Sequence, residues 1–221
     1  MEERMREKLK KCRKVVLMLV CILTVGLLGG CTSSKDAESY LQALLDASYK
    51  NDSKTFVEIR LGTQEEAQAL YNQGIDTGVS AFCSSLGVDE EYQEEFRQIY
   101  MDMLAKVRYT VGSAQKQSDG SFAVTVSYEK MNIFKPALEL YQSDVAAMAN
   151  EWAVSDDGTP SEEEMMREVI LAFKKSMETV LAEVQYDEAE TMIIRIELAD
   201  NVYTPNAEDV AKLEKALFDG E

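Results

Sequence analysis

Apolar side chains recur every three to four residues through most of the chain, the spacing that places them on one face of a helix. Asp36 is a candidate cap for the first helix, which the segment 51–53 interrupts. Thr63 and Glu66 form a capping box at the start of a later helix, which Gly87 ends. Further helices are predicted from the apolar positions of these segments: Phe56 to Ile59, Tyr92 to Val107, Leu138 to Trp152, Met166 to Val184 and Val210 to Leu217.

Two segments alternate between apolar and polar residues, as half-buried strands do. They lie on either side of Asp119-Gly120, a dipeptide typical of a two-residue hairpin turn. Such a turn predicts that Val111 lies opposite Tyr128 and that Gln115 lies opposite Val124.

A third strand is predicted over 191–199, with four apolar residues facing inward: Met192, Ile194, Ile196 and Leu198. Together these segments predict an α+β fold that is helix-rich, with a small antiparallel sheet of about three strands packed on amphipathic helices.

The hairpin carries the candidate ligand site. Tyr109, Val111, Val126 and Tyr128 are predicted on the face of the hairpin that the helices cover. Apolar walls with two hydroxyl groups suit a cup that holds a small molecule. The alternative is that these four side chains only fill the core.

The first 30 residues have a different pattern. Seven Lys/Arg and three Glu fall within the first fourteen residues, and a largely apolar run of about 14 residues, Val15 to Leu28, follows. This order of charge and hydropathy is typical of an export signal, and the run is shorter than the roughly 20 residues that a spanning helix needs. An uncleaved membrane anchor is the alternative.

Leu28-Gly29-Gly30-Cys31 ends this run and resembles the lipobox of bacterial lipoproteins. The resemblance implies that the Cys31 thiol receives a diacylglyceryl group and that a signal peptidase cuts between Gly30 and Cys31. Two acyl chains hold a protein at a membrane far more firmly than one. The predicted organisation is a signal peptide at 1–30, a lipidated tether at 31–35 and one α+β domain at 36–221, on the extracytoplasmic face of the cell membrane.

The charge of the chain excludes one class of partner. Residues 1–30 carry a net charge of about +4, so their removal changes the formal net charge from −17 to about −21. A domain this acidic is not expected to bind nucleic acid, because phosphate contacts need Lys and Arg.

Cysteine and histidine limit the chemistry. The chain has four Cys and no His, which excludes Ser-His-Asp and Cys-His catalysis as well as His-ligated zinc. Cys83 is the one cysteine beyond Cys31, and its apolar neighbours predict a buried helix position. We expect neither a metal nor a cofactor.

Two short motifs have structural explanations. Gly74 and Gly78 form a GxxxG pattern among polar residues, which predicts close helix contact or a kink rather than packing within a membrane. The acidic stretch around 156–164 lacks the ligand spacing of an EF-hand and is expected to be a capped helix start.

The stretch from Tyr40 to Asp52, followed by Phe56-Val57, resembles a family of surface lipoproteins of Gram-positive gut bacteria that carry a domain of unknown function. The resemblance covers about residues 31–130. Some related lipoproteins are NTF2-like, a cone of curved sheet and helices that can hold a small ligand. Three predicted strands are fewer than such a cone has. The family has no assigned activity, so the resemblance implies no functional residues.

Three functions follow as hypotheses. The first is a non-enzymatic, lipid-anchored protein that binds an unidentified envelope protein. The second is a small-molecule-binding, NTF2-like cup behind the hairpin. The third is an enzyme that uses carboxylates or Tyr, although no particular pair of carboxylates stands out among so many.

Overall fold

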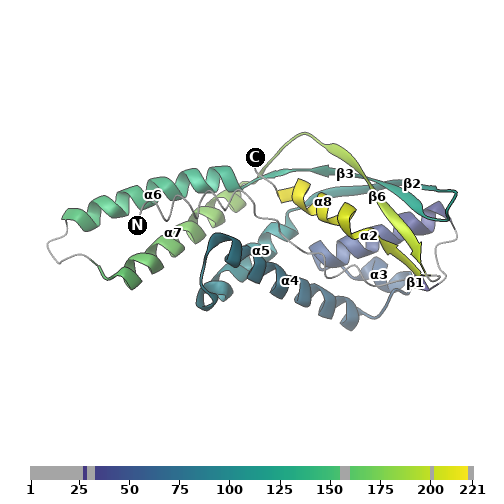
Figure 1. Ribbon diagram of the computed structural model, residues 1–221, viewed down its shortest axis with the longest axis horizontal. Helices are drawn as coiled ribbons and strands as arrows, with labels where there is room; N and C mark the ends of the chain where they lie inside the picture. Colours follow the sequence, from purple (N-terminus) through teal and green to yellow (C-terminus); the bar gives the residue numbers. More distant parts are fainter. Residues whose placement is uncertain (1–26, 29–32, 155–159, 200–201, 219–221) are drawn as a thin grey trace.

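The computed structural model describes residues 27–28, 33–154, 160–199 and 202–218 (Figure 1). This part of the chain is mainly helical with a small antiparallel sheet, which confirms the predicted α+β class. In chain order the elements are β1 (Leu27–Leu28), α2 (Ser34–Lys50), α3 (Lys54–Glu58), α4 (Gln64–Leu86), η1 (Glu90–Tyr92), α5 (Gln93–Ala105), β2 (Arg108–Lys116), β3 (Phe122–Glu129), β4 (Met131–Asn132), α6 (Phe134–Val154), α7 (Glu162–Ala182), β5 (Gln185–Tyr186), β6 (Glu190–Ala199), β7 (Val202–Pro205) and α8 (Ala207–Phe218).

The main sheet is antiparallel and has the strand order β1-β7-β6-β3-β2. Strand β3 lies between β2 and β6, so the hairpin and the predicted third strand are neighbours. Helices α2 and α8 lie against one face of this sheet (Figure 1). The ribbon of β4 and β5 is separate, and neither it nor β7 was predicted.

The predicted register of the hairpin is wrong. Val111 lies opposite Val126 rather than Tyr128, a difference of two residues. Nearer the turn, Gln115 lies opposite Ala123, a difference of one residue. Two local features account for these differences in register, one at the turn and one within β2.

The turn is one residue longer than Asp119-Gly120 indicated. The Gln117 N–H donates to the Ser121 carbonyl at 2.8 Å, which closes a three-residue loop over 118–120. Gly120 has a φ of 89°, in the left-handed region that such a loop needs at its last position.

The second feature is a bulge in β2 between Val111 and Ala114. It leaves the Ala114 N–H to donate to Glu38 Oε1 of α2 at 2.8 Å, so the disrupted backbone group keeps a partner. The turn and the bulge each shift the register by one residue. Because a shift of two residues leaves side chains on the same face of the sheet, Tyr109 and Val111 still face the helices as predicted.

Helix α2 begins earlier than predicted. Ser33, not Asp36, is its cap: the Ser33 hydroxyl accepts from the Asp36 N–H at 3.3 Å, and Asp36 accepts from the Ser33 N–H at 3.0 Å. The capping box favours this start because it satisfies two backbone donors at once. Residues 34–35, predicted as tether, therefore belong to the helix.

The N-terminal predictions fall largely outside the structure. Gly30 and Cys31 lie outside the described residues. Leu27 and Leu28, within the predicted signal peptide, pair with Tyr203 and Val202 of β7 at the edge of the sheet.

Helices α4 and α5 pack closely, as the GxxxG pattern predicted. The Thr63–Glu66 capping box starts α4, and Gly87, with a φ of 67°, ends it. A Cβ atom on Gly78 would collide with the ring and hydroxyl of Tyr100 on α5, so only glycine allows this approach. Cys83 is fully buried, as expected.

Helices α6 and α7 form a hairpin that projects from the rest of the molecule (Figure 1), which we call the arm. At its base, the Phe173 ring packs edge-on against Tyr141, with the centroids 5.5 Å apart. The same ring lies tilted against Phe96 of α5, with the centroids 6.2 Å apart. Ser161 caps α7 and forms a capping box with Glu164, so the acidic stretch does contain a capped helix start, as expected. The remainder of the described chain is the body.

The arm and the start of α2 lie at opposite ends of the body. The first turn of α2 is beside the turn end of the β2–β3 hairpin, where Glu38 contacts Ala114. The arm joins the other end of the sheet, between β3 and β6. From the lengths of α6 and β3, the far end of the arm is on the order of 50 Å from Ser33.

Candidate functional site

The four predicted cup residues share one face of the hairpin. Tyr109 pairs with Tyr128 and Val111 pairs with Val126 across β2 and β3. Val126 is fully buried and Val111 is half-buried against the core, so these two side chains pack rather than line an opening. Tyr109 and Tyr128 are each 9% exposed and lie at the edge of the packed face.

Both tyrosine hydroxyls are bound to carboxylates. Tyr109 donates to Asp46 Oδ1 at 2.6 Å, and Tyr128 donates to Glu190 Oε2 at 3.0 Å. Burial, followed by these hydrogen bonds, raises the pKa of both tyrosines above its ordinary value. A hydroxyl with a raised pKa is a poor acid or nucleophile at neutral pH.

A small recess of about 240 Å³ adjoins these two tyrosines. Its remaining walls come from the end of α2, the ends of β2 and β3 and the residue before β6: Lys50, Val107, Arg108, Thr110, Ser127, Glu129 and Ala189. The recess is below the range of about 300–1,000 Å³ that drug-sized ligands occupy.

The two cations of this recess are already paired. Lys50 lies 3.2 Å from Asp46 Oδ1 and 4.1 Å from the centroid of the Tyr109 ring. Arg108 donates to Glu129 at 2.8 Å, and its guanidinium stacks 3.6 Å from the centroid of the Tyr186 ring. An anionic ligand would have to compete with both carboxylates.

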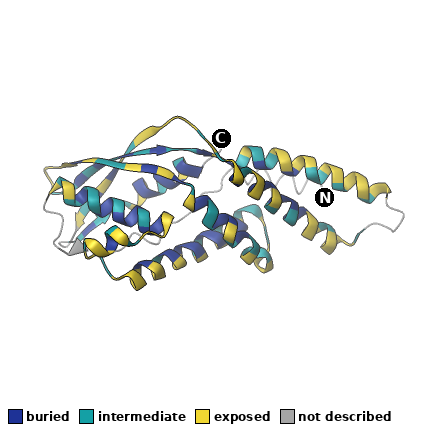
Figure 2. Cartoon of the chain, turned by 180° about the vertical axis from the view of Figure 1, so that it is seen from behind, coloured by how far each residue is buried: buried dark blue, intermediate teal, exposed yellow. Residues whose placement is uncertain are grey.

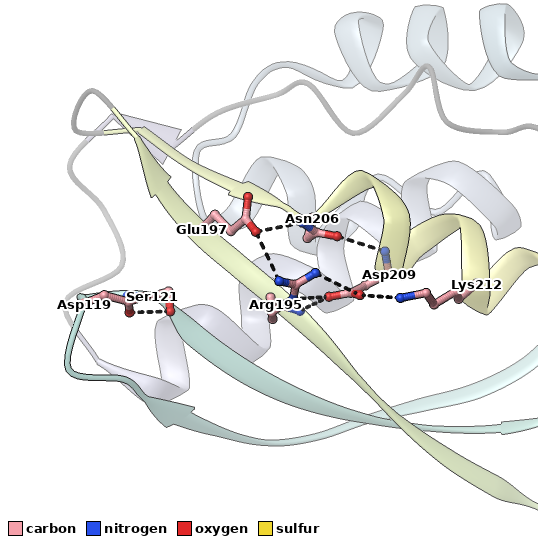
Figure 3. Close-up of polar contacts among 7 residues, drawn as sticks. All are labelled: Asp119, Ser121, Arg195, Glu197, Asn206, Asp209 and Lys212. Atoms are coloured by element: carbon pink, nitrogen blue, oxygen red, sulfur yellow. Dashed lines mark hydrogen bonds and ion pairs between the residues drawn. The ribbon is translucent and has the colours of Figure 1, made fainter.

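A polar cluster fastens α8 to β6 (Figure 3). Asp209 accepts from Arg195 Nε at 2.7 Å and from the Arg195 backbone N–H at 3.2 Å, and Lys212 approaches it at 3.4 Å. Asn206 caps α8 through the Asp209 N–H and donates to Glu197 at 2.7 Å. Burial opposes the charged form of Asp209, but Arg195 and Lys212 together lower its pKa below the ordinary value.

Other reactive chemistry is sparse in the described part of the chain. Burial raises the pKa of the Cys83 thiol to about 11, which suits a core residue. No three acidic or cysteine side chains among the described residues gather closely enough to hold a metal ion. None of the helices described combines the length and the apolar character that crossing a membrane requires.

The end of the arm is a surface that sequence reasoning missed. We define the arm tip as residues 142–154 of α6 and 162–168 of α7, none of which is buried (Figure 2). Val154 is 80% exposed and Met166 is 44% exposed. The helical spacing of Val145, Met148 and Trp152 had predicted a core face, but these side chains are only partly buried.

Two sequence comparisons found nothing similar: no protein-family model matches the chain, and no curated protein does.

A search of solved structures found a crystal structure of a proposed lipoprotein (ycdA) from Bacillus subtilis subsp. subtilis strain 168. The TM-score is 0.56 at 13% sequence identity, and the match covers 81% of this chain. The chain spans 55% of the length of that protein. The likeness shows a shared fold. The NTF2-like cup stays a prediction.

Proposed function

We propose that this protein is a lipid-anchored extracytoplasmic protein, held to the cell membrane through lipid on Cys31, and that its domain is a non-enzymatic interaction module whose binding element is the arm. The observation that carries the proposal is the placement of the arm at the opposite end of the body from Ser33. A lipid only two residues before Ser33 keeps that end at the membrane. The arm tip then faces away from the bilayer, where a partner can reach it.

The state of the tyrosines supports a binding rather than a catalytic role. The hydroxyls of Tyr109 and Tyr128 are held by carboxylates, and the nearby cations Lys50 and Arg108 are neutralised. Val154 and Met166 of the arm tip, in contrast, are exposed apolar side chains. Exposed apolar surface of this kind marks interaction sites.

Anchoring is tested by following a fatty-acid label in the native host. Cys31→Ala should abolish labelling and leave a larger, unprocessed precursor, since the thiol is the acceptor and cleavage follows lipidation. Labelling that survives the substitution would refute the anchor.

The arm as the binding element is tested by photo-crosslinking in intact cells. A crosslinking residue at Met166 should give discrete adducts with another polypeptide, whereas one at Ile193, 48% exposed on the sheet, should not. Adducts from Ile193 with none from Met166 would overturn the assignment of the arm.

A second candidate function, small-molecule binding, is favoured by the recess beside Tyr109 and Tyr128. Protein from residue 32 onward, purified from the native host, should then show a reproducible excess in native mass over denatured mass. Equal masses, together with an unchanged melting temperature in a metabolite extract, would reject this candidate.

A further inference from the structure

The arm tip combines exposed apolar side chains with a strong excess of negative charge. Val154 and Met166 are exposed, and Met148, Trp152 and Met165 are half-buried. Methionine side chains are flexible and polarisable, so a surface that contains several can adapt to a partner's shape. An apolar patch of this kind needs a partner that contributes apolar groups of its own.

The charge around this patch restricts that partner. The tip carries six acidic residues and one basic residue: Asp144, Glu151, Glu162, Glu163, Glu164, Glu168 and Arg167. A surface of one sign attracts the opposite sign and repels its own. Anionic lipids and anionic wall polymers are therefore disfavoured, as is a second copy of this chain, whose tip carries the same charge.

We infer that the arm tip is a docking surface for a basic polypeptide segment that also carries apolar side chains. The apolar side chains of the partner cover Val154 and Met166, and its Lys and Arg side chains pair with the surrounding carboxylates. This inference rests on the proposed function, since it names the partner class of the same arm. The distance of the tip from the predicted lipid fits a polypeptide partner better than the bilayer itself.

Trp152 makes binding at the tip directly measurable, because it is the single tryptophan of the chain. The probe is an 18-residue amphipathic peptide of Lys and Leu, titrated into the processed full domain while the Trp152 emission is followed. We expect a saturable change in emission that weakens as the salt concentration rises, because salt screens exposed ion pairs. A peptide in which Glu replaces Lys should give no change.

Charge is tested by neutralising three exposed tip residues. The triple variant Glu162→Gln, Glu163→Gln and Glu168→Gln should bind the basic peptide roughly tenfold more weakly, since each exposed pair contributes a modest share. Glu164 is left in place because it completes the capping box of α7.

A matched variant distinguishes the effect of the charges at the tip from the effect of the net charge of the protein. Glu58, Glu183 and Glu188 are exposed residues outside the tip, and their triple substitution by Gln changes the net charge by the same amount. This control should bind as the unsubstituted protein does. Equal weakening in both triple variants would overturn the inference, because binding would then follow net charge alone.

The apolar contribution has its own matched pair. Val154→Ser at the tip should weaken binding several-fold, whereas Val57→Ser, at an exposed position of α3, should not. Circular dichroism and melting temperature establish that each variant is folded. Equal binding by both serine variants would refute a docked apolar contact.

The remaining outcomes separate this inference from the proposed function. Binding of the Glu-Leu peptide, or of vesicles containing phosphatidylglycerol, with an equal or higher affinity would overturn the basic-polypeptide assignment. Crosslinks from Met166 in cells, combined with no binding of the basic peptide, would reject the partner class and leave the arm as the binding element. If a crosslinking residue at Met166 gave no adducts in cells, the proposed function itself would be rejected.

Discussion

Helices α2 and α6 each carry an apolar stripe, but far more of α2 than of α6 is buried. Nine of the 17 residues of α2 are buried, among them Tyr40 and Tyr49, because α2 lies between the sheet and the other helices of the body. Of the 21 residues of α6 only Ala137 and Tyr141 are buried, both near the base of the arm. Periodicity therefore tells which face of a helix is apolar, while the surrounding fold decides whether that face is covered.

The largest effect is expected where the body is most tightly packed. Gly78→Ala places a methyl group against the Tyr100 side chain, which is fully buried. Overpacking of this kind costs about 1–3 kcal/mol, and we expect the upper part of that range. Urea unfolding measures the loss.

A second substitution shows whether the collision is the cause. The Tyr100 hydroxyl is the atom nearest to the added methyl group, and it has no hydrogen-bond partner among the described residues. Tyr100→Phe removes that atom and should restore part of the stability that Gly78→Ala loses. A double variant no more stable than Gly78→Ala would show that the ring of residue 100, and not the Tyr100 hydroxyl, causes the loss of stability.

The sequence predicted local chemistry well where one short pattern decides the outcome. The Thr63–Glu66 capping box, Gly87 and the close packing at Gly78 are all present as predicted. The register of the hairpin was wrong because the turn is one residue longer than predicted and because β2 has a bulge after Val111. The Ala114 N–H at this bulge donates to Glu38, 76 residues away in the sequence. No local pattern contains such a contact.

The candidate site was predictable in part. Alternation placed Tyr109 and Tyr128 correctly on the covered face, but it could not show that their hydroxyls would be bound by Asp46 and Glu190 from other elements. Leu198, predicted to face inward, is 40% exposed near the end of β6. The arm tip was missed because a stripe of apolar residues looks the same whether or not another element covers it.

The next effect concerns the contact that fastens α8 to the body. Asp209→Asn removes the charge that pairs with Arg195 and should lower the stability by about 1 kcal/mol at pH 7. The folded-state pKa of Asp209 is below its ordinary value of 3.8, so its contribution is complete above that pH and is lost as the pH falls through the folded pKa. The free energies of unfolding of the unsubstituted protein and of Asp209→Asn should therefore differ by less at pH 3 than at pH 7. A constant difference would mean that the charge of Asp209 does not stabilise α8.

A smaller loss is expected at the edge of the packed face. Tyr109→Phe removes one hydrogen bond to Asp46, which keeps Lys50 and the Gln42 amide as partners. The cost should be about 0.5–1.5 kcal/mol. Tyr128→Phe is the matched variant, and its loss of stability should be smaller. Glu190 is exposed, so water replaces the hydrogen bond that Tyr128 donated. Equal losses would show that exposure of the carboxylate does not matter here.

The smallest effect provides the most direct comparison of arm and body, because one substitution can be made in both. Val154→Ser alters a side chain that is 80% exposed at the arm tip and should change the free energy of unfolding by less than about 0.5 kcal/mol. Val79→Ser alters one that is 3% exposed on α4 and should cost about 2 kcal/mol or more, since it buries a hydroxyl and removes apolar volume. A large loss at Val154 would mean that the tip is packed against something in the free protein and is not a surface kept for a partner. A small loss, combined with weaker peptide binding by the same variant, would separate the two roles of apolar side chains in this molecule: those of the body stabilise the fold, and those of the tip serve recognition.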